Sequence, residues 1–300
     1  MGSKETGEGA DLVQRVADTL RAELTDGSTY HVGGRYPTQR ELADRLGVSR
    51  DTVQKALREI THEGWIESRR GSGTKVIKTQ LVHTSTARRH SGPGAAALGP
   101  FIEAAFEEEE VALDVFTLTA QSLTSHLGVA SQRVQSGEIS PRCITVRLLL
   151  PDLRQPSLYP RNVADPNDPR PLERLRAISR RYTDLLVDTL LDLQQESRPG
   201  DGSAGTVPEV DVQVAQVPHY PTGKLYLLNG EEALHGFYDL VDRDVRLEDG
   251  QEIRITDVIG LGATLFHYAK DEDAASEGSR FVSASQRMFN SYWERSRPAR

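Results

Sequence analysis

Residues 38–53 constrain the fold of this chain more than any other segment, because they carry start and stop signals for two short helices. Thr38 and Glu41 have the spacing of a capping box, in which each residue binds a free backbone N–H at the start of a helix. Gly47 stands where glycine favours the left-handed end of that helix, and Ser49 can cap a second one. The apolar residues recur at helical spacing, at Leu42, Leu46, Val53, Ala56, Leu57 and Ile60. The segment is therefore predicted to be a helix-turn-helix.

Elements on both sides predict a winged form of this motif. A helix is expected upstream, because apolar residues repeat every four positions at Leu12, Val16, Leu20 and Leu24. Downstream, residues 63–68 and 74–77 have the composition of two short strands. Residues 69–73 lie between these strands and form a basic, glycine-containing tip.

Residues 11–78 as a whole resemble the DNA-binding domain of GntR-family bacterial repressors. The resemblance rests on motifs in matching order and spacing, which are RYPTQRELA at 35–43, LGVSRDTV at 46–53, EGWI at 63–66 and GSGT at 71–74. In a winged helix-turn-helix the second helix enters the DNA major groove. By this resemblance, the glycine-bearing wing is expected to enter the minor groove.

The helix positions and the resemblance together predict a set of DNA contacts. Arg50 is the first choice for a two-pronged contact with guanine, and it is expected to share the exposed side of the second helix with Thr52 and Lys55. The resemblance implies that Arg40 and Ser49 also bind the operator. Residues just before the first helix are expected to contact phosphates, which position a protein without specifying sequence. The predicted DNA-binding residues are Arg35, Thr38, Arg40, Ser49, Arg50, Thr52, Lys55, Arg69, Arg70, Gly71 and Gly73.

The distribution of charge agrees with this interpretation, although the net charge of the chain is −8. Residues 35–78 contain ten lysines and arginines against six acidic residues, so the excess acid lies elsewhere. The single cysteine, Cys143, suits a reducing cytoplasm. No apolar stretch has the length of a membrane span, and residues 1–10 are expected to be a disordered leader. The sequence therefore predicts a soluble, cytoplasmic protein without a membrane partner.

Residues 79–100 are predicted to be an exposed linker, and residues 101–300 a second domain of mixed α/β type. Its strands are expected at residues 111–118, 144–150, 210–217, 224–228, 252–255 and 264–268. Its helices are expected at residues 119–135, 172–193 and 279–295. The fold class is thus two-domain α/β, with a winged helix-turn-helix followed by an α/β sandwich that senses an effector and forms the dimer.

The second domain resembles a degenerate phospholipase D domain at the spacing of Thr222, Lys224, Asn229 and Gly236. Thr222 stands at the position of the nucleophilic histidine, Asn229 at that of the aspartate and Asp239 at that of a late asparagine. Threonine without an adjacent base cannot replace an attacking imidazole, so the resemblance implies a fold that has lost catalysis. Lys224 can still hold an anionic ligand, although an ordinary lysine at the start of a strand would give the same spacing. The predicted ligand-binding residues are His219, Thr222, Lys224 and Asn229.

These features predict a regulator of transcription, most simply a repressor, that binds a palindromic operator as a homodimer. A small-molecule effector, which the lysine suggests is anionic, is expected to control it through the second domain. No catalytic residue, cofactor or metal is predicted. Three alternatives remain open: the effector domain of the HutC branch of GntR proteins, an active DNA-targeted phosphodiesterase, and a structural DNA-binding protein without an effector.

Overall fold

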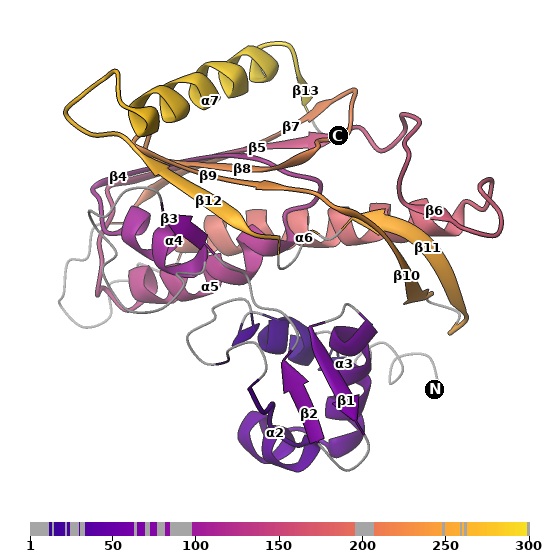
Figure 1. Cartoon of the computed structure of the whole chain (residues 1–300). Helices are drawn as coiled ribbons and strands as arrows, with labels where there is room; N and C mark the ends of the chain where they lie inside the picture. Colours follow the sequence, from indigo (N-terminus) through magenta and orange to yellow (C-terminus); the bar gives the residue numbers. More distant parts are fainter. Residues whose placement is uncertain are drawn as a thin grey trace. The chain divides into compact units, whose positions relative to one another are not determined.

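The computed structural model of the chain describes residues 12–13, 15–21, 23–24, 30, 34–62, 65–69, 73–76, 82–84, 98–195, 207–247, 250–258, 260 and 263–298. The chain divides into two units (Figure 1). The N-terminal unit comprises residues 1–81 and 93–97, and the C-terminal unit comprises residues 82–92 and 98–300.

The N-terminal unit contains helices and strands in the order that the sequence predicts. The described residues between 12 and 24 are helical. They precede α2 (Gln39–Leu46), α3 (Arg50–His62), β1 (Ile66–Arg69) and β2 (Gly73–Val76). β1 and β2 are antiparallel and form the body of the wing.

A third segment, which the sequence did not indicate, extends the wing sheet. Arg35 forms an antiparallel bridge with Lys75 of β2. The backbone N–H of Tyr36 donates to the carbonyl of Thr74 at 2.8 Å. The core of this unit consists of side chains that are almost completely buried, namely Val16, Ala17, Leu20, Leu24, Tyr36, Leu42, Val53, Ala56, Ile60, Trp65, Ile66 and Val76.

The C-terminal unit is a mixed α/β domain. Its helices are α4 (Leu98–Phe106), α5 (Gln121–Gln135), α6 (Arg170–Gln195) and α7 (Glu277–Trp293). Its strands are β3 (Val82–Thr84), β4 (Glu110–Phe116), β5 (Cys143–Pro151), β6 (Arg161–Asn162), β7 (Glu209–Val217), β8 (Gly223–Leu228), β9 (Glu232–Phe237), β10 (Leu240–Arg246), β11 (Glu252–Val258), β12 (Leu265–Ala269) and β13 (Arg297–Pro298).

An eight-stranded sheet in the order β13-β7-β5-β4-β8-β9-β12-β3 organises this unit. β4, β5 and β7 are parallel to one another, while β8, β9 and β12 follow in antiparallel pairs. A smaller sheet in the order β10-β11-β6 extends from it.

Helices cover both faces of the large sheet, with α4, α5 and α6 on one side and α7 on the other (Figure 1). Strands that are covered on both faces are apolar almost throughout, which explains the nearly continuous apolar run of β5. On β8, Leu225 and Leu227 pack in one cluster with Val282 and Phe289 of α7. Alternation along a strand therefore directs Lys224 and Tyr226 of β8 to the face of α4, α5 and α6.

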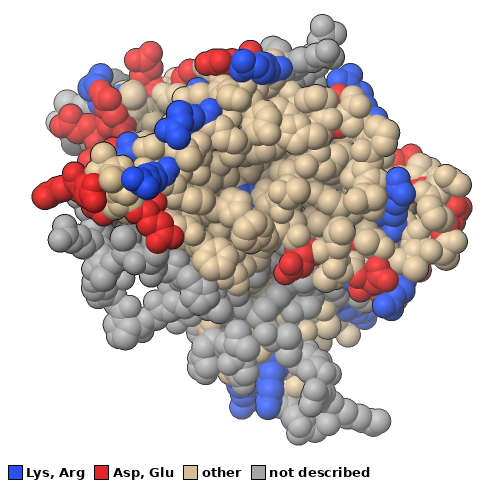
Figure 2. All heavy atoms as spheres, turned by 45° about the horizontal axis from the view of Figure 1, so that its top comes forward, with Lys and Arg blue, Asp and Glu red and all other residues tan. Residues whose placement is uncertain are grey.

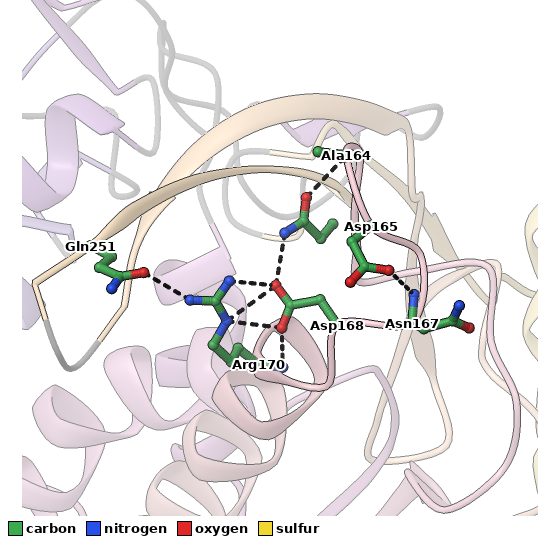
Figure 3. Close-up of polar contacts among 7 residues, drawn as sticks. Ala164, Asp165, Asn167, Asp168, Arg170 and Gln251 are labelled. Carbon is green, nitrogen blue, oxygen red and sulfur yellow. Dashed lines mark hydrogen bonds and ion pairs between the residues drawn. The ribbon is translucent and has the colours of Figure 1, made fainter.

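Hydrogen bonds between polar side chains connect the β10–β11 hairpin to the first turn of α6 (Figure 3). The Arg170 guanidinium donates to the Asp168 carboxylate at 2.8 Å and to Gln251 of the hairpin at 2.9 Å. Asn162 of β6 also donates to Asp168, at 2.7 Å. Hydrogen bonds from Arg170 and Asn162 hold the pKa of the Asp168 carboxyl far below its ordinary value.

Most of the predicted elements of the second domain are present, but several were missed. Residues 79–100, which were expected to be a linker, contribute β3 and the start of α4 to the C-terminal unit. β3 is three residues long and pairs only at the edge of the sheet beside β12, so it is too short to show a periodic pattern. The sequence also gave no indication of β9, β10 or the short strands β6 and β13. Within the described part of the chain, no helix combines the length and apolar composition that a bilayer span requires.

Candidate DNA-binding surface and buried lysine site

The capping box that the sequence predicts at the start of α2 is formed. The Glu41 backbone N–H donates to the Thr38 hydroxyl at 3.3 Å, and the Thr38 backbone N–H donates to the Glu41 carboxylate at 2.7 Å. The backbone N–H and then the hydroxyl of Thr38, which both donate to the Glu41 carboxylate, lower the pKa of this carboxyl. Gly47 ends the helix with φ = 65°, a conformation that glycine adopts without steric cost. The turn into α3 is therefore fixed at both sides by local hydrogen bonds and backbone preference.

The first turn of α3 is organised by Ser49. Its hydroxyl accepts a hydrogen bond from the backbone N–H of Thr52 at 3.1 Å and lies 2.8 Å from the Thr52 hydroxyl. Thr52 is only 9% exposed and lies on the same side of the helix as the buried residues Val53 and Ala56. The prediction that Thr52 lies on the exposed side of the helix is therefore wrong. Its side chain packs inward, and its hydroxyl lies within hydrogen-bond distance of Ser49, the residue that caps the helix.

Of the predicted DNA-binding cations, the four whose side chains the structure describes are all exposed. Arg50 and Arg35 are both exposed. Lys55 pairs with Asp51 on the same helix at 2.7 Å, and Arg40 lies 3.9 Å from Asp44. Exposed pairs of this kind contribute little to stability, so their cations are readily exchanged for phosphate.

The wing contains further residues of the predicted DNA-binding set. Gly73 begins β2 with φ = 76°, which requires glycine at this point. Lys75 is exposed on the same strand beside Arg35, and the sequence analysis did not single it out. Arg69 ends β1, although its side chain is not described, and the predicted contacts Arg70 and Gly71 lie outside the described residues.

Comparison with known proteins identifies this unit. The family model "Bacterial regulatory proteins, gntR family" matches residues 12–76. These residues are a GntR-type winged helix-turn-helix domain. The chain is also similar to the Exu regulon transcriptional regulator of Escherichia coli strain K12, with 36% identity over 90 residues, which are 30% of this chain and 34% of the relative.

Other similar proteins match over comparably short segments. The uncharacterized HTH-type transcriptional regulator YisV of Bacillus subtilis is 48% identical over 68 residues, covering 23% of this chain and 14% of that protein. A transcriptional antiterminator of Listeria monocytogenes is similar at 24% identity and a TM-score of 0.18, over 28% of this chain and 55% of that structure. The chain thus spans only about a third of the length of the first of these relatives. Each of the two regulators matches 30% of this chain or less, so the similarity concerns only a part of it.

Outside the GntR domain, Lys224 occupies an unusual position in the C-terminal unit. Its side chain is almost completely buried, and its ammonium group donates to the Ser122 hydroxyl in the first turn of α5 at 3.2 Å. Lys224 lies opposite Gly236 on β9. A Cβ atom at Gly236 would lie 2.7 Å from the carbonyl oxygen of Thr264 and 3.6 Å from Cγ of Lys224. Glycine at this position therefore lets β12 and the lysine stem lie close to β9.

Two further polar groups are buried around this lysine. Burial, and then the positive charge of Lys224, lowers the pKa of the His126 imidazole to about 4, so the ring is neutral at pH 7. His126 Nε2 has no hydrogen-bond partner among the described residues. The Tyr226 hydroxyl also lacks a partner of standard geometry there, although it lies beside Ser122. Burial raises the pKa of Tyr226 well above its ordinary value.

The four predicted ligand-binding residues do not converge on one site. Thr222 is exposed just before β8. Asn229 lies at the other end of that strand, where its side chain accepts from the backbone N–H of Ala112 at 2.8 Å and donates to the carbonyl of Ala105 at 3.0 Å. Asn229 therefore holds a turn, and of the set only Lys224 belongs to the buried polar cluster.

His219 also lies away from the lysine. Its ring packs against Phe116 at 5.8 Å and against Tyr292 of α7 at 5.1 Å, which places it on the opposite face of the sheet. Sequence reasoning missed Ser122, His126 and Tyr226 as neighbours of Lys224. Tyr226 was recoverable, because residues two apart on a strand share a face.

Proposed function

We propose that this chain is a sequence-specific DNA-binding regulator of transcription, acting as a repressor. The observation that carries this proposal is the geometry of α3. Its buried side anchors it to the core of the GntR domain, while Arg50 and Lys55 remain exposed at its start and middle. The N-terminal residues of a recognition helix are the ones that reach base edges in the major groove. A location in the cytoplasm with the DNA follows from this role.

The exposed cations divide into two kinds of contact. Arg50 is assigned to base recognition, because the planar guanidinium can bind both acceptors of guanine. Arg35, Thr38 and Arg40, which lie before and at the start of α2, are assigned to phosphates, together with Lys75 on the wing. Phosphate contacts contribute affinity that falls with rising salt, whereas base contacts determine which sequence is bound.

The proposal includes a homodimer on a palindromic operator. A single winged domain buries a small area on DNA, and specific affinity increases when two domains read two half-sites. Two copies related by a twofold axis would read half-sites that are separated by about one helical turn.

The C-terminal unit is proposed to sense an anionic small molecule through a non-catalytic phospholipase D-like fold. The position that would carry a nucleophilic imidazole is occupied by Thr222, so phosphodiester cleavage through a covalent histidine intermediate is not expected. Lys224, Ser122 and Tyr226 offer one ammonium and two hydroxyl groups, which suits a phosphoryl or carboxylate group. A ligand that favours one arrangement of the dimer changes DNA affinity by a coupling free energy of about 1–3 kcal/mol.

Selection of bound sequences from random duplex DNA tests the proposed function. The full chain is compared with Arg50→Ala and with Arg287→Ala, which removes an exposed arginine from α7 of the C-terminal unit. We expect a palindrome for the full chain and for Arg287→Ala, and relaxed preference at one base pair of each half-site for Arg50→Ala. If the full chain selects no sequence, or if both variants behave alike, the assignment of α3 as the recognition helix is wrong.

A further inference from the structure

An exposed aromatic surface flanks α7 on the large sheet. On this side of the sheet, His235 of β9 lies between Leu225 of β8 and Phe266 of β12 in the strand register. Within this row, Leu225 packs with Val282 and Phe289 of α7, so the helix covers one end of the row. Phe237 is 61% exposed and Phe266 is 38% exposed, although both are large apolar side chains. Solvent therefore reaches part of a sheet face that a helix otherwise covers.

One flank of α7 continues this surface. Phe281, Met288 and Tyr292 are seven and four residues apart, which places them on one side of the helix. Phe281 stacks on Tyr268 of β12 with ring centroids 3.9 Å apart, so it fixes the start of this flank against the sheet. Met288 is 37% exposed and Tyr292 is 36% exposed. The helix thus adds an apolar wall beside the exposed strands.

Ring contacts through His235 connect the exposed end of β9 with the start of the α7 flank. The His235 ring lies 4.7 Å from Phe237 and 6.2 Å from Phe281. We name the set Phe237, Phe266, Phe281, Met288 and Tyr292 the aromatic face. Isolated exposed apolar residues are common on proteins, whereas contiguous ones mark interaction surfaces.

The five residues of the aromatic face are uncharged, and the exposed arginines Arg280 and Arg287 stand next to Phe281 and Met288 in the sequence of α7. Figure 2 shows a broad, mostly tan area on one side of the C-terminal unit, with most of the Lys, Arg, Asp and Glu side chains around its border. Asp114 and Arg147 lie on the same sheet face, but they bind each other beneath α7. The face itself therefore consists of uncharged side chains, which favours an apolar partner over a nucleic acid or an acidic peptide.

We infer that the aromatic face is the surface through which two copies of this chain form a dimer. The chain carries a net charge of −8, so two copies repel each other wherever acidic surfaces meet. A twofold axis brings one patch against the same patch of the second copy. An uncharged aromatic surface meets this condition without opposing like charges, and apolar residues at the centre with a polar rim are the usual composition of such contacts. The inference rests on the homodimer of the proposed function and specifies where it forms.

Sedimentation velocity of the full chain over a range of concentrations tests this inference. The variant Phe237→Asp places a carboxylate at an exposed position of the aromatic face, and Met288→Glu does so on the helix. We expect each to raise the dimer dissociation constant by at least tenfold, roughly the effect of losing one interface hot spot. The matched control is Leu158→Asp, because Leu158 is even more exposed but lies on the proline-rich loop after β5. This control should dimerise like the unaltered chain.

Three results would overturn the inference. They are a monomeric full chain at every concentration, unchanged dimerisation in both aromatic-face variants, or equal loss of the dimer in Leu158→Asp. Circular dichroism of each variant verifies that the fold is retained. Selection of DNA sequences separates this outcome from the proposed function, because a monomer with an intact GntR domain would still select a single half-site.

Discussion

Arg147 and Asp114 lie opposite each other on the neighbouring parallel strands β5 and β4, and their side chains form a two-pronged ion pair beneath α7. The guanidinium Nε lies 2.6 Å from one carboxylate oxygen of Asp114. Gln286 of α7 donates to the same carboxylate at 2.6 Å, and the guanidinium lies over the rings of Phe289 and Trp293. The pair therefore anchors the helix whose flank forms the aromatic face.

Replacing Arg147 is expected to destabilise the C-terminal unit. Arg147→Met leaves the carboxylate of Asp114 buried without its cation, and loss of one partner of a largely buried pair costs about 2–4 kcal/mol. Scanning calorimetry or urea denaturation measures the loss. The control Arg142→Met breaks an exposed pair with Glu110 and should change the free energy of unfolding by less than about 1 kcal/mol. Equal effects of the two substitutions would show that the buried pair contributes no more to the free energy of unfolding than the exposed pair does.

Asn229 is predicted to stabilise the β8–β9 turn without contributing to ligand binding. Its φ of 52° lies in the left-handed region, and its side chain makes two hydrogen bonds to backbone groups. Asn229→Ala should lose about 2–3 kcal/mol, since it combines left-handed strain with the lost hydrogen bonds.

Comparison with glycine separates the two contributions of Asn229. Asn229→Gly loses the same side-chain hydrogen bonds, but glycine adopts the left-handed conformation without strain. This substitution should therefore reduce the free energy of unfolding in urea less than Asn229→Ala does. If Asn229→Ala is as stable as the unaltered chain but no longer responds to an anionic effector, Asn229 contributes to ligand binding and this prediction is wrong.

The parts of the fold that the sequence predicted are those encoded locally. The capping box at Thr38 and Glu41 and the helix end at Gly47 depend on residues within one turn of each other. The strands β5 and β8 carry nearly continuous apolar runs because both sheet faces are covered, whereas β7 alternates polar and apolar residues along its length. Local spacing was therefore sufficient to predict these elements.

The predictions that failed have two different causes. Thr52 was expected on the exposed side of α3, but it lies four residues before the buried Ala56 and shares its side of the helix, which is a matter of local spacing. The other failures involve contacts between distant segments. His219 and Lys224 are close in sequence, yet they lie on opposite faces of the large sheet. The partners of Lys224, which are Ser122 and His126, come from α5 about a hundred residues earlier, and no spacing rule joins them.

The capping box is predicted to contribute measurably to the stability of the GntR domain. Thr38→Ala removes the hydroxyl that accepts from the backbone N–H of Glu41, and loss of such a cap costs about 1 kcal/mol. Thr61→Ala is the matched control, because the Thr61 hydroxyl only donates to a carbonyl within α3 and is exposed. Thermal denaturation of the full chain should show the lower transition temperature for Thr38→Ala alone. If Thr61→Ala proves equally destabilising, the capping hydrogen bond of Thr38 contributes no more to stability than the hydroxyl of Thr61 does.

The buried imidazole of His126 is predicted to make the C-terminal unit less stable in acid. Its pKa is about 4 in the folded chain, whereas an unfolded histidine titrates near its ordinary value of about 6.5. Between these values the unfolded state binds more protons, so stability is fully present above the unfolded pKa and falls as the pH drops toward 4. The contribution of this one group has a slope of at most about 1.4 kcal/mol per pH unit.

Urea denaturation between pH 4 and pH 7 measures this dependence. The comparison is between the unaltered chain and His126→Gln, whose profile should be flatter over that interval. Lys224→Met removes the positive charge that disfavours protonation of His126 and should make the profile less steep, whereas Lys270→Met, at an exposed pair with Glu231, should leave it unchanged. Parallel profiles for the unaltered chain and His126→Gln would mean that His126 is accessible to protons in the folded state. The buried cluster around Lys224 would then be open to solvent, contrary to the structure.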